Sequence, residues 1–365
     1  MDSILEKLHE PRFFDAFVRE NMKTSTYKAE WKEEGINTEF CASKVYQAYL
    51  AEHTAAMVGS VIDKNGEKPT HVMPSVEQLT GALGRMGDEW QMDNDRLDQF
   101  IYLEGRYRDK KAGYTQEQNV DEFNKLVKFL FDPFEKAVIA PQKRLDLLYF
   151  EGLFNGTQTV SRSNNVKANV SYTYPLGVKT FQAKVAQWGN STSTPIDDIQ
   201  AVVDYCEAHG KTVQKIRMSK RTFRQMCKSS QILGAFTLKL QKVEVRPSAV
   251  SVADVNSYLE SILLPTIQIE KDRYSTLANG TQTNLTVDNR VVFQCAASVA
   301  TMKVADPVEA VDPLPNKVYS VHDENHVGYW RNERGRFIDY EMWATPVFTG
   351  VNDYFILKTD EVEAA

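Results

Sequence analysis

The segment "HDENH" places two histidines, His322 and His326, around Asp323 and Glu324. On a helix, histidines four residues apart share a face and could hold a metal ion, as in a metal-dependent hydrolase. The valines and tyrosine of 318–321, followed by the glycine at 328, favour a strand and a turn instead. In the zinc-protease pattern Glu directly follows the first histidine, a position that Asp323 occupies here. We interpret the segment as a solvated loop and keep the metal-dependent hydrolase as an alternative.

A second candidate is the basic stretch 211–243, which contains no acidic residue. It could form a basic DNA-binding module that contacts phosphates. Because the cations lack the aromatic interleaving that suggests base stacking, we favour a helix face balanced by acids of the preceding helix. The cations are Lys211, Lys215, Arg217, Lys220, Arg221, Arg224, Lys228, Lys239 and Lys242, and the expected acids are Asp197, Asp198, Asp204 and Glu207. A smaller basic cluster, Arg331, Arg334 and Arg336, is expected on a loop.

Other signatures of catalysis are missing from the sequence. It has no G-x-S-x-G, no P-loop and no G-x-G-x-x-G. The four cysteines are widely spaced, form no C-x-x-C pair and are interpreted as reduced, mostly buried thiols: Cys41, Cys206, Cys227 and Cys295. The sequence therefore predicts no enzyme, no catalytic residue, no metal site and no cofactor.

Composition narrows the class of protein further. The chain has 365 residues, 42% hydrophobic and 25% charged, which suggests two or three globular domains. A net charge of −6 gives no overall basic surface for tight nucleic-acid binding. The N-terminus lacks the features of a signal peptide, and no stretch approaches the ~20 apolar residues of a membrane span. We expect a soluble protein made in a reducing cytoplasm.

The elements that would position any site begin with a long helix. From Val120 apolar residues recur at helical spacing, and Asn155-Gly156 predicts a left-handed C-terminal cap before a strand at 157–160. Pro133 and Pro141 each remove a backbone donor and should kink or segment the helix. The part at 142–154 is apolar on several faces, which predicts burial against more than one partner.

The N-terminal quarter reads as extended. Residues 1–30 suggest an arm anchored by Phe13, Phe14 and Phe17. In 31–75, residues 58–63 read as a strand and "DKNG" as the tip of a projecting hairpin.

A compact α/β unit follows the long helix. Thr194 is the expected N-cap of a helix that starts at Pro195 and stops at Gly210. Its predicted buried stripe is Ile196, Ile199, Val203 and Cys206. "TVQKIRMS" is expected to be a strand, Ser219 caps the next helix, and 354–358 form a final strand. The chain as a whole is expected to be α+β.

Three segments together resemble the major capsid proteins of tailed phages, specifically the lambda gpE-type family. They are "RLDLLYFEGLFNGTQTV", "AQWGNSTSTPIDDIQAVVDYCEAHGKTVQKIRMSKRTFRQM" and "ATPVFTGVNDYFILKT". The resemblance implies the Hong Kong 97-type (Johnson) capsid fold. On this mapping the N-terminal arm is 1–30, the extended hairpin loop 31–75, the peripheral domain 76–185 with a spine helix at about 120–155, the axial domain 186–300, and the return to the peripheral domain with closing strands 301–365.

The resemblance also implies a function and partners. The expected protein self-assembles as hexamers and pentamers into an icosahedral phage head around double-stranded DNA, which it contacts only weakly. Scaffold, portal and decoration proteins are expected partners, with the virion as location and the host cytoplasm during assembly. A thin shell tile buries apolar area between subunits. The candidate interface residues are Phe13, Phe17, Trp31, Phe40, Val58, Ile62, Met73, Tyr149 and Phe150.

Overall fold

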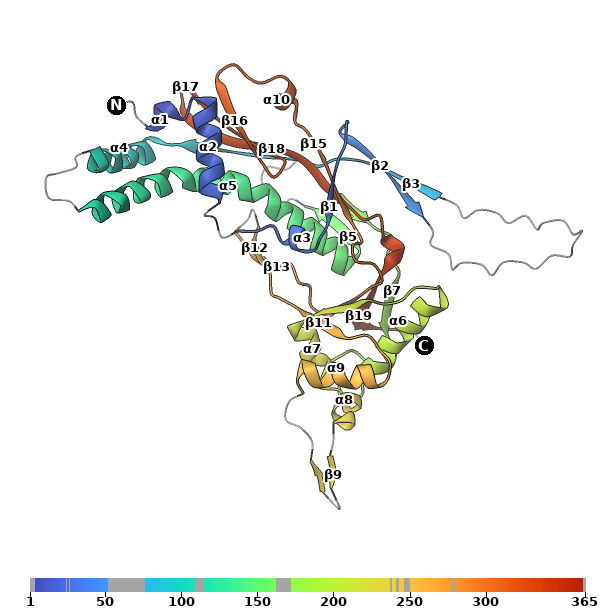
Figure 1. The fold of residues 1–365 in the computed structure, drawn as a ribbon. Coiled ribbons are helices and arrows are strands. Elements are labelled where there is room, and N and C mark those ends of the chain that lie inside the picture. Colours follow the sequence, from blue (N-terminus) through green and yellow to red (C-terminus); the bar gives the residue numbers. More distant parts are fainter. Residues whose placement is uncertain are drawn as a thin grey trace, which may run out of the picture.

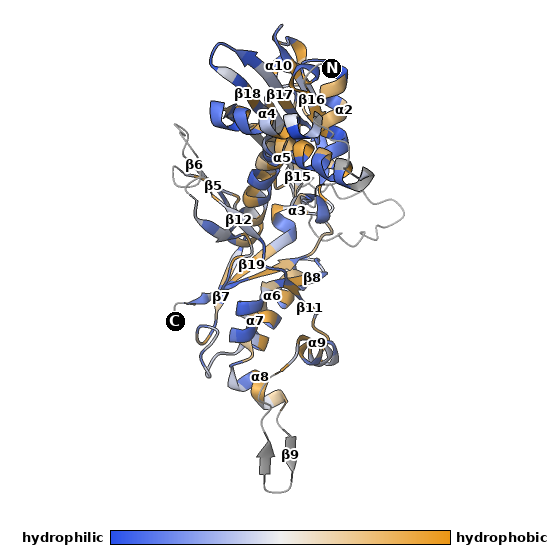
Figure 2. Ribbon diagram, turned by 90° about the vertical axis from the view of Figure 1, so that its left-hand side faces the viewer, coloured by the Kyte–Doolittle hydropathy of each residue, from blue (hydrophilic) through white to orange (hydrophobic). Residues whose placement is uncertain are grey.

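In the computed structural model two large β-sheets, of six and five strands, are joined by a long helix, α5 (Gln116–Asn155). In the turned view of Figure 2 the two sheets with their helices lie one above the other, giving an elongated body. The described residues are 4–363 without 24, 26, 52–75, 109–114, 162–171, 237, 241–242, 246–249 and 278–279.

The first sheet has six strands drawn from both ends of the chain. Its order is β1 (Asn37–Phe40), β15 (Thr301–Ala305), β18 (Gly335–Val347), β17 (Asn325–Asn332) and β16 (Lys317–His322), and β4 (Arg85–Met92) also pairs with β18. Burial alternates along β18, so one face of the sheet packs on α5. The short helix α10 (Val308–Val311) lies between β15 and β16.

The N-terminal helices pack on this same body. They are α1 (Ile4–Lys7), α2 (Pro11–Met22) and α3 (Glu30–Glu33). Phe14 and Val18 of α2 are buried, and the Phe17 ring lies 5.8 Å from Phe131 and 6.0 Å from Phe134 of α5. The arm therefore docks on its own chain.

A two-stranded ribbon leaves the body beside the first sheet (Figure 1). It consists of β2 (Val45–Ala51) and β3 (Val76–Ala82), which are antiparallel with Ala51 opposite Val76. This is the base of a hairpin. The predicted strand at 58–63 and the predicted turn after it lie outside the described residues.

Helix α5 spans 40 residues without interruption. Thr115 caps its start in a capping box with Gln118, and Gly156 ends it at φ +67°, as predicted. Of the two effects expected of the prolines, a kink or a segmented helix, segmentation does not occur. Figure 1 shows a helix that bends along its length and continues, with α4 (Asn94–Arg108) beside its first part.

The two prolines are tolerated because other elements supply the missing donors. Without an N–H, Pro133 leaves the carbonyl of Phe129 free, and Arg96 Nη2 donates to that oxygen at 3.0 Å. Pro141 leaves the carbonyl of Ala137 free, and Asn325 Nδ2 donates to it at 3.0 Å. Each break in the helical ladder is thus filled by a side chain of α4 or β17. No described helix, α5 included, is long and apolar enough to cross a membrane.

The second sheet has the order β11 (Ile267–Glu270), β8 (Lys215–Ser219), β14 (Arg290–Gln294), β19 (Tyr354–Val362) and β7 (Thr180–Ala183). Its helices are α6 (Pro195–Ala208), α7 (Lys220–Met226), α8 (Ser230–Ala235) and α9 (Val252–Ser261). The final strand β19 therefore pairs with strands of the central region, not with the strands of 301–347 among which it was expected. The turn η1 (Val351–Asp353) leads into it.

Three further pairs of short strands extend from these bodies. They are β5 (Thr157–Val160) with β6 (Tyr172–Pro175), β9 (Leu238–Leu240) with β10 (Val243–Val245), and β12 (Tyr274–Thr276) with β13 (Gln282–Asn284).

The local signals around α6 are largely confirmed. Pro195 is its first residue, the predicted stripe is buried, and Gly210 follows at φ +71°. Thr194 occupies the N-cap position, but its side chain makes no cap hydrogen bond. Gln231 of α8 caps the helix instead, because its Oε1 accepts a hydrogen bond from the N–H of Ile196 at 2.9 Å. Ser219 caps α7 as predicted.

Candidate functional site

The two histidines of "HDENH" lie on the β16–β17 hairpin. Asp323 and Glu324 form its turn at φ +50° and +59°. His322 lies in the residue pair that closes the turn and His326 in the next pair, so their side chains point to opposite faces of the ribbon. Within the described part of the chain no group of three His, Cys, Asp or Glu could hold a metal ion. The metal-dependent hydrolase finds no support here.

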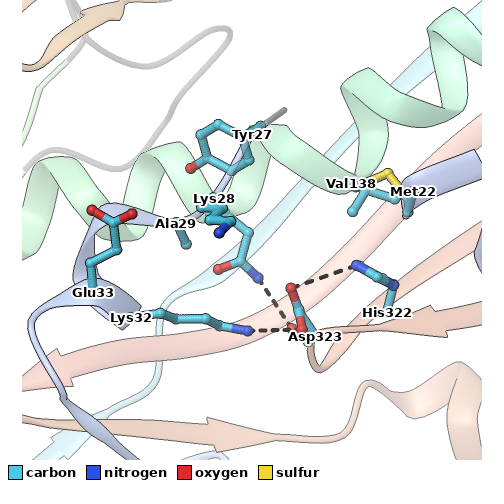
Figure 3. A pocket seen from close by; sticks show the side chains of 10 residues that line it. Met22, Tyr27, Lys28, Ala29, Lys32, Glu33, Val138, His322 and Asp323 are labelled. Carbon is cyan, nitrogen blue, oxygen red and sulfur yellow. Dashed lines mark hydrogen bonds and ion pairs between the residues drawn. The ribbon is translucent and has the colours of Figure 1, made fainter. Parts of the chain in front are cut away.

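The surroundings of His322 form a pocket of about 340 Å³ between the arm, α5 and the hairpin turn (Figure 3). Asp323 is at its centre. Its carboxylate lies 2.8 Å from Lys32 Nζ and 3.6 Å from His322 Nε2, and its backbone carbonyl accepts from Gln142 Nε2 at 3.1 Å. These contacts tie three segments together. The ion pair with Lys32 engages the Asp323 carboxylate, the group beside His322 that could have oriented it as a base.

The cations of 211–243 are mostly paired, but not with the acids expected. Lys211 pairs with Asp353 at 3.2 Å, Lys220 with Asp272 at 3.3 Å, and Arg221 with Asp288 at 3.5 Å. Asp198 instead accepts hydrogen bonds from Trp188 Nε1 and from the N–H of Lys184, both at 2.9 Å. The basic residues are therefore balanced by acids, but these acids come from other segments and not from the preceding helix. Among the described side chains of this stretch, Lys215, Arg224 and Lys228 have no carboxylate partner within reach. The "RNERGRF" cluster forms the β17–β18 hairpin, not a free loop.

The ion pairs of Arg217 belong to a buried network that sequence reasoning missed. Arg217 Nε lies 2.6 Å from Glu270, and its two terminal nitrogens lie 2.7 and 2.8 Å from the two oxygens of Glu34. Arg273 lies 2.7 Å from Glu270 and 3.1 Å from Glu30. Burial alone would raise the pKa of Glu270, but the two guanidinium groups hold it below its usual value.

This network joins the N-terminal segment to the second sheet. Glu30 is the first residue of α3 and Glu34 follows its last, whereas Arg217 lies on β8 and Glu270 on β11. The Arg273 guanidinium also lies over the Phe150 ring of α5, 4.5 Å from its centroid. Three segments distant in sequence therefore meet at one set of charges.

Three of the predicted interface residues are buried inside the chain. Trp31, Tyr149 and Phe150 are 1%, 2% and 0% exposed. Their core includes residues of both sheets, such as Val292 of β14 and Met342 of β18. We correct the explanation of the apolar helix at 142–154 accordingly: its several faces are covered by the two sheets of its own subunit.

The other interface candidates remain predictions. Phe40 is 60% exposed at the end of the edge strand β1, and Phe13 and Phe17 are half-buried in the arm. Val58, Ile62 and Met73 lie outside the described residues.

The arm is fixed to α5 by a buried acid, Asp146. Its carboxylate accepts from the N–H of Trp31 at 2.8 Å and from the Tyr27 hydroxyl at 2.9 Å. Trp31 Nε1 also donates to Gln142 at 3.0 Å. Burial raises the pKa of Asp146 to about 6, against the partial opposition of its hydrogen bonds. The folded state therefore holds a proton that the unfolded state releases at lower pH.

This predicts how stability depends on pH. Because the folded-state pKa of Asp146 is raised, its contribution is fully present below about pH 4 and is lost as the pH rises through about 6. In Asp146→Asn this dependence disappears, so wild type should lose about 3 kcal/mol relative to the variant over that interval. Urea unfolding of both proteins from pH 4 to 7 measures the difference. A constant difference would show that Asp146 titrates normally.

The arrangement of the two sheets and α5 is similar to that of a solved structure. Along nearly its full length the chain is similar to a protein described as a capsid protein of a prophage of E. coli CFT073, with a TM-score of 0.55 and 12% identity over 95% of this chain and 98% of that one. The chain has the fold of a phage capsid protein. The predicted α+β class and Hong Kong 97-type capsid fold are thereby confirmed.

Two further matches have lower TM-scores. The capsid of the cyanophage A-1(L) gives 0.47 at 10% identity, over 92% of this chain and 94% of that one. The capsid of the Myoviridae phage XM1 gives 0.44 at 10% identity, over 92% and 93%. No protein-family model and no curated protein matches the sequence. The capsid-protein fold is therefore recognised through the structure.

Proposed function

We propose that this protein is the major capsid protein of a tailed bacteriophage, which self-assembles as hexamers and pentamers into an icosahedral shell around a double-stranded DNA genome. The observation that carries the proposal is the match to a prophage capsid protein over 95% of this chain. The ribbon β2–β3 supports it, because a projecting pair of strands is suited to reach a neighbouring subunit. The proposed location is the virion, with the host cytoplasm during assembly.

The proposed roles of the segments follow the same mapping. Residues 1–30 are the arm and 31–75 the extended loop. The axial domain is 186–300 together with β7 and β19, which pair in its sheet, and the remainder is the peripheral domain with its spine helix. Scaffold, portal and decoration proteins are the proposed partners, and DNA is contacted weakly because the net charge is −6. The proposed role is structural, without catalysis.

The direct test is electron microscopy of the overexpressed protein, with a scaffold protein added if needed. Shells, tubes or capsomers are expected. A variant lacking residues 58–70 should remain folded by circular dichroism and fail to close shells. Normal shells from that variant would remove the extended-loop assignment, whereas a concentration-independent monomer of the wild type would overturn the capsid function itself.

Leu263 provides a second, finer test of assembly. It follows α9 in a left-handed conformation, at φ +63°, and its side chain is 91% exposed. The left-handed conformation costs a non-glycine residue about 1–2 kcal/mol. The exposure of the apolar side chain to water is a second cost in an isolated subunit. On the proposed function, this leucine contacts another copy of the chain.

Leu263→Gly should therefore have opposite effects on the two states. We expect the unfolding midpoint of the unassembled subunit to rise, because the strain is relieved, while the yield of assembled particles falls. Light scattering against protein concentration measures assembly, and thermal unfolding measures stability. Leu263→Asn is the matched control that keeps a side chain suited to the left-handed region. Unchanged assembly in both variants would exclude Leu263 from the interface.

A further inference from the structure

A lysine and an aspartate meet across an intervening strand of the first sheet. Lys317 lies on β16, Asp339 on β18, and Gly328 on β17 between them. Gly328 is the residue opposite Asp339, and its pair with Tyr319 lies two positions along the ladder from the pair of Lys317 with Trp330, on the same face. A Cβ at 328 would collide with Lys317 Cε and with Asp339 Oδ1. Because Gly328 has no side chain, the space above it is open, and Lys317 and Asp339 touch there.

A third group completes the cluster. Lys317 Nζ lies 2.6 Å from Asp339 Oδ2 and 2.7 Å from Oε2 of Glu309 on α10. The Lys317 side chain is 7% exposed, and its Nζ lies 4.7 Å from the centre of the Trp330 ring and 5.3 Å from that of Tyr319. Aromatic rings therefore exclude water from an amine held against a carboxyl group.

The charges in this cluster do not balance if all three groups are ionised. One cation faces two carboxylates, so one carboxyl group is favoured to keep a proton in these partly dry surroundings. Burial raises the pKa of Asp339, whereas burial is outweighed at Glu309 by Lys317 and Tyr319, which lower the pKa of that carboxyl. Asp339 Oδ1 is buried without a hydrogen-bond partner, which disfavours the anion there. Of the two carboxyl groups, Asp339 is therefore the one that more readily takes up a proton, and Glu309 the one that more readily stays ionised.

A neutral carboxylic acid, a lysine amine and a base in contact are the components of amide formation. We propose that Lys317 and Asp339 join in an intrachain isopeptide bond, with Glu309 as the proton carrier. Glu309 accepts a proton from the Lys317 ammonium group, and the Nζ lone pair attacks Cγ of the protonated Asp339. One C–N bond forms and one C–O bond breaks. The Asp339 hydroxyl oxygen leaves as water, and the proton held by Glu309 passes to solvent.

The bond would link β16 to β18 across β17, and the reaction needs no oxidant, metal or cofactor. Proximity is the principal contribution, because the reacting groups are already in contact in the folded chain. The inference depends only on the first sheet and is independent of the proposed capsid function.

The test is the mass of the full chain after denaturation. The folded and purified protein should be lighter than its sequence by one water. A tryptic digest should contain one peptide pair joining residues 304–331 to residues 337–358, because an acylated Lys317 resists trypsin. A loss of one water that maps to a cyclic imide at another aspartate would overturn the proposal. So would a full mass after prolonged incubation of the folded protein between pH 6 and 9.

Two variants separate the chemistry from the fold. Lys317→Arg keeps the cation and its ion pairs but has no primary amine, and Glu309→Gln keeps the side-chain shape but removes the proton acceptor. Both should have the full mass of their sequences, with circular dichroism showing that they fold. Loss of one water in either variant contradicts the roles assigned. The mass of the native protein decides the proposal even where a variant does not fold.

Discussion

Arg217→Met is expected to lower the free energy of unfolding by about 3–5 kcal/mol, the usual cost of breaking a buried ion pair from one side. Methionine retains the apolar stem, so the loss is mainly electrostatic. Glu270 has a side chain that is 2% exposed and would keep only Arg273 as a partner, whereas Glu34 would lose its two-point contact. Urea unfolding at neutral pH measures the change. The variant should also loosen the junction between α3 and the second sheet.

The matched control is Arg221→Met, in the first turn of α7, the helix that directly follows β8. Arg221 is 71% exposed and lies 3.5 Å from Asp288, so its removal should cost less than about 1 kcal/mol. An equal and small effect in both variants would mean that the desolvation of Arg217 cancels the attraction in the network. A protease-sensitive N-terminus in Arg217→Met alone would support the junction role.

Asn325→Ala is expected to destabilise the protein by about 1–3 kcal/mol, because it leaves a buried carbonyl without a donor. Asn325 is fully buried, and its amide is the donor that Pro141 cannot provide to Ala137. The loss should be visible as a lower urea midpoint with an unchanged slope. The hydrogen bonding of α5 at Pro141 is thus completed from outside the helix.

A double-mutant cycle identifies this mechanism. Pro141→Ala restores a backbone N–H that can donate to the carbonyl of Ala137, so Asn325→Ala should cost less in that background than in the wild type. The remaining cost is that of the cavity left by the truncated side chain. Strictly additive effects of the two changes would show that the asparagine stabilises the protein through other contacts.

Local signals predicted the parts of the fold where the chain needs few distant partners. Pro195, the apolar stripe of α6 and Gly210 act over one helix, and Gly156 ends α5 by its own backbone conformation. The resemblance of three segments predicted the capsid fold, which sequence searches alone did not detect. These predictions succeeded because each depends on residues close together in sequence.

Other features depend on distant partners and left no readable pattern. Glu34 and Arg217 are 183 positions apart, and neither has a spacing that points to the other. Pro133 was expected to kink or segment α5 because the rule counts only donors within the helix, whereas Arg96 of α4 supplies the missing one. The apolar helix at 142–154 led to the prediction of a contact with a neighbouring subunit, because the two sheets that cover it come from residues far away in sequence.

The pairing of the strands has a consequence for synthesis on the ribosome. The first sheet joins β1 and β4 to strands that begin at residue 301, and β7 of the second sheet pairs only with β19, which ends at Val362. Neither sheet can close before almost the whole polypeptide has emerged. Long-range pairing of this kind folds slowly. Nascent chains therefore finish folding after release. An incomplete chain has neither sheet fully formed and so presents no finished sheet edge to other chains.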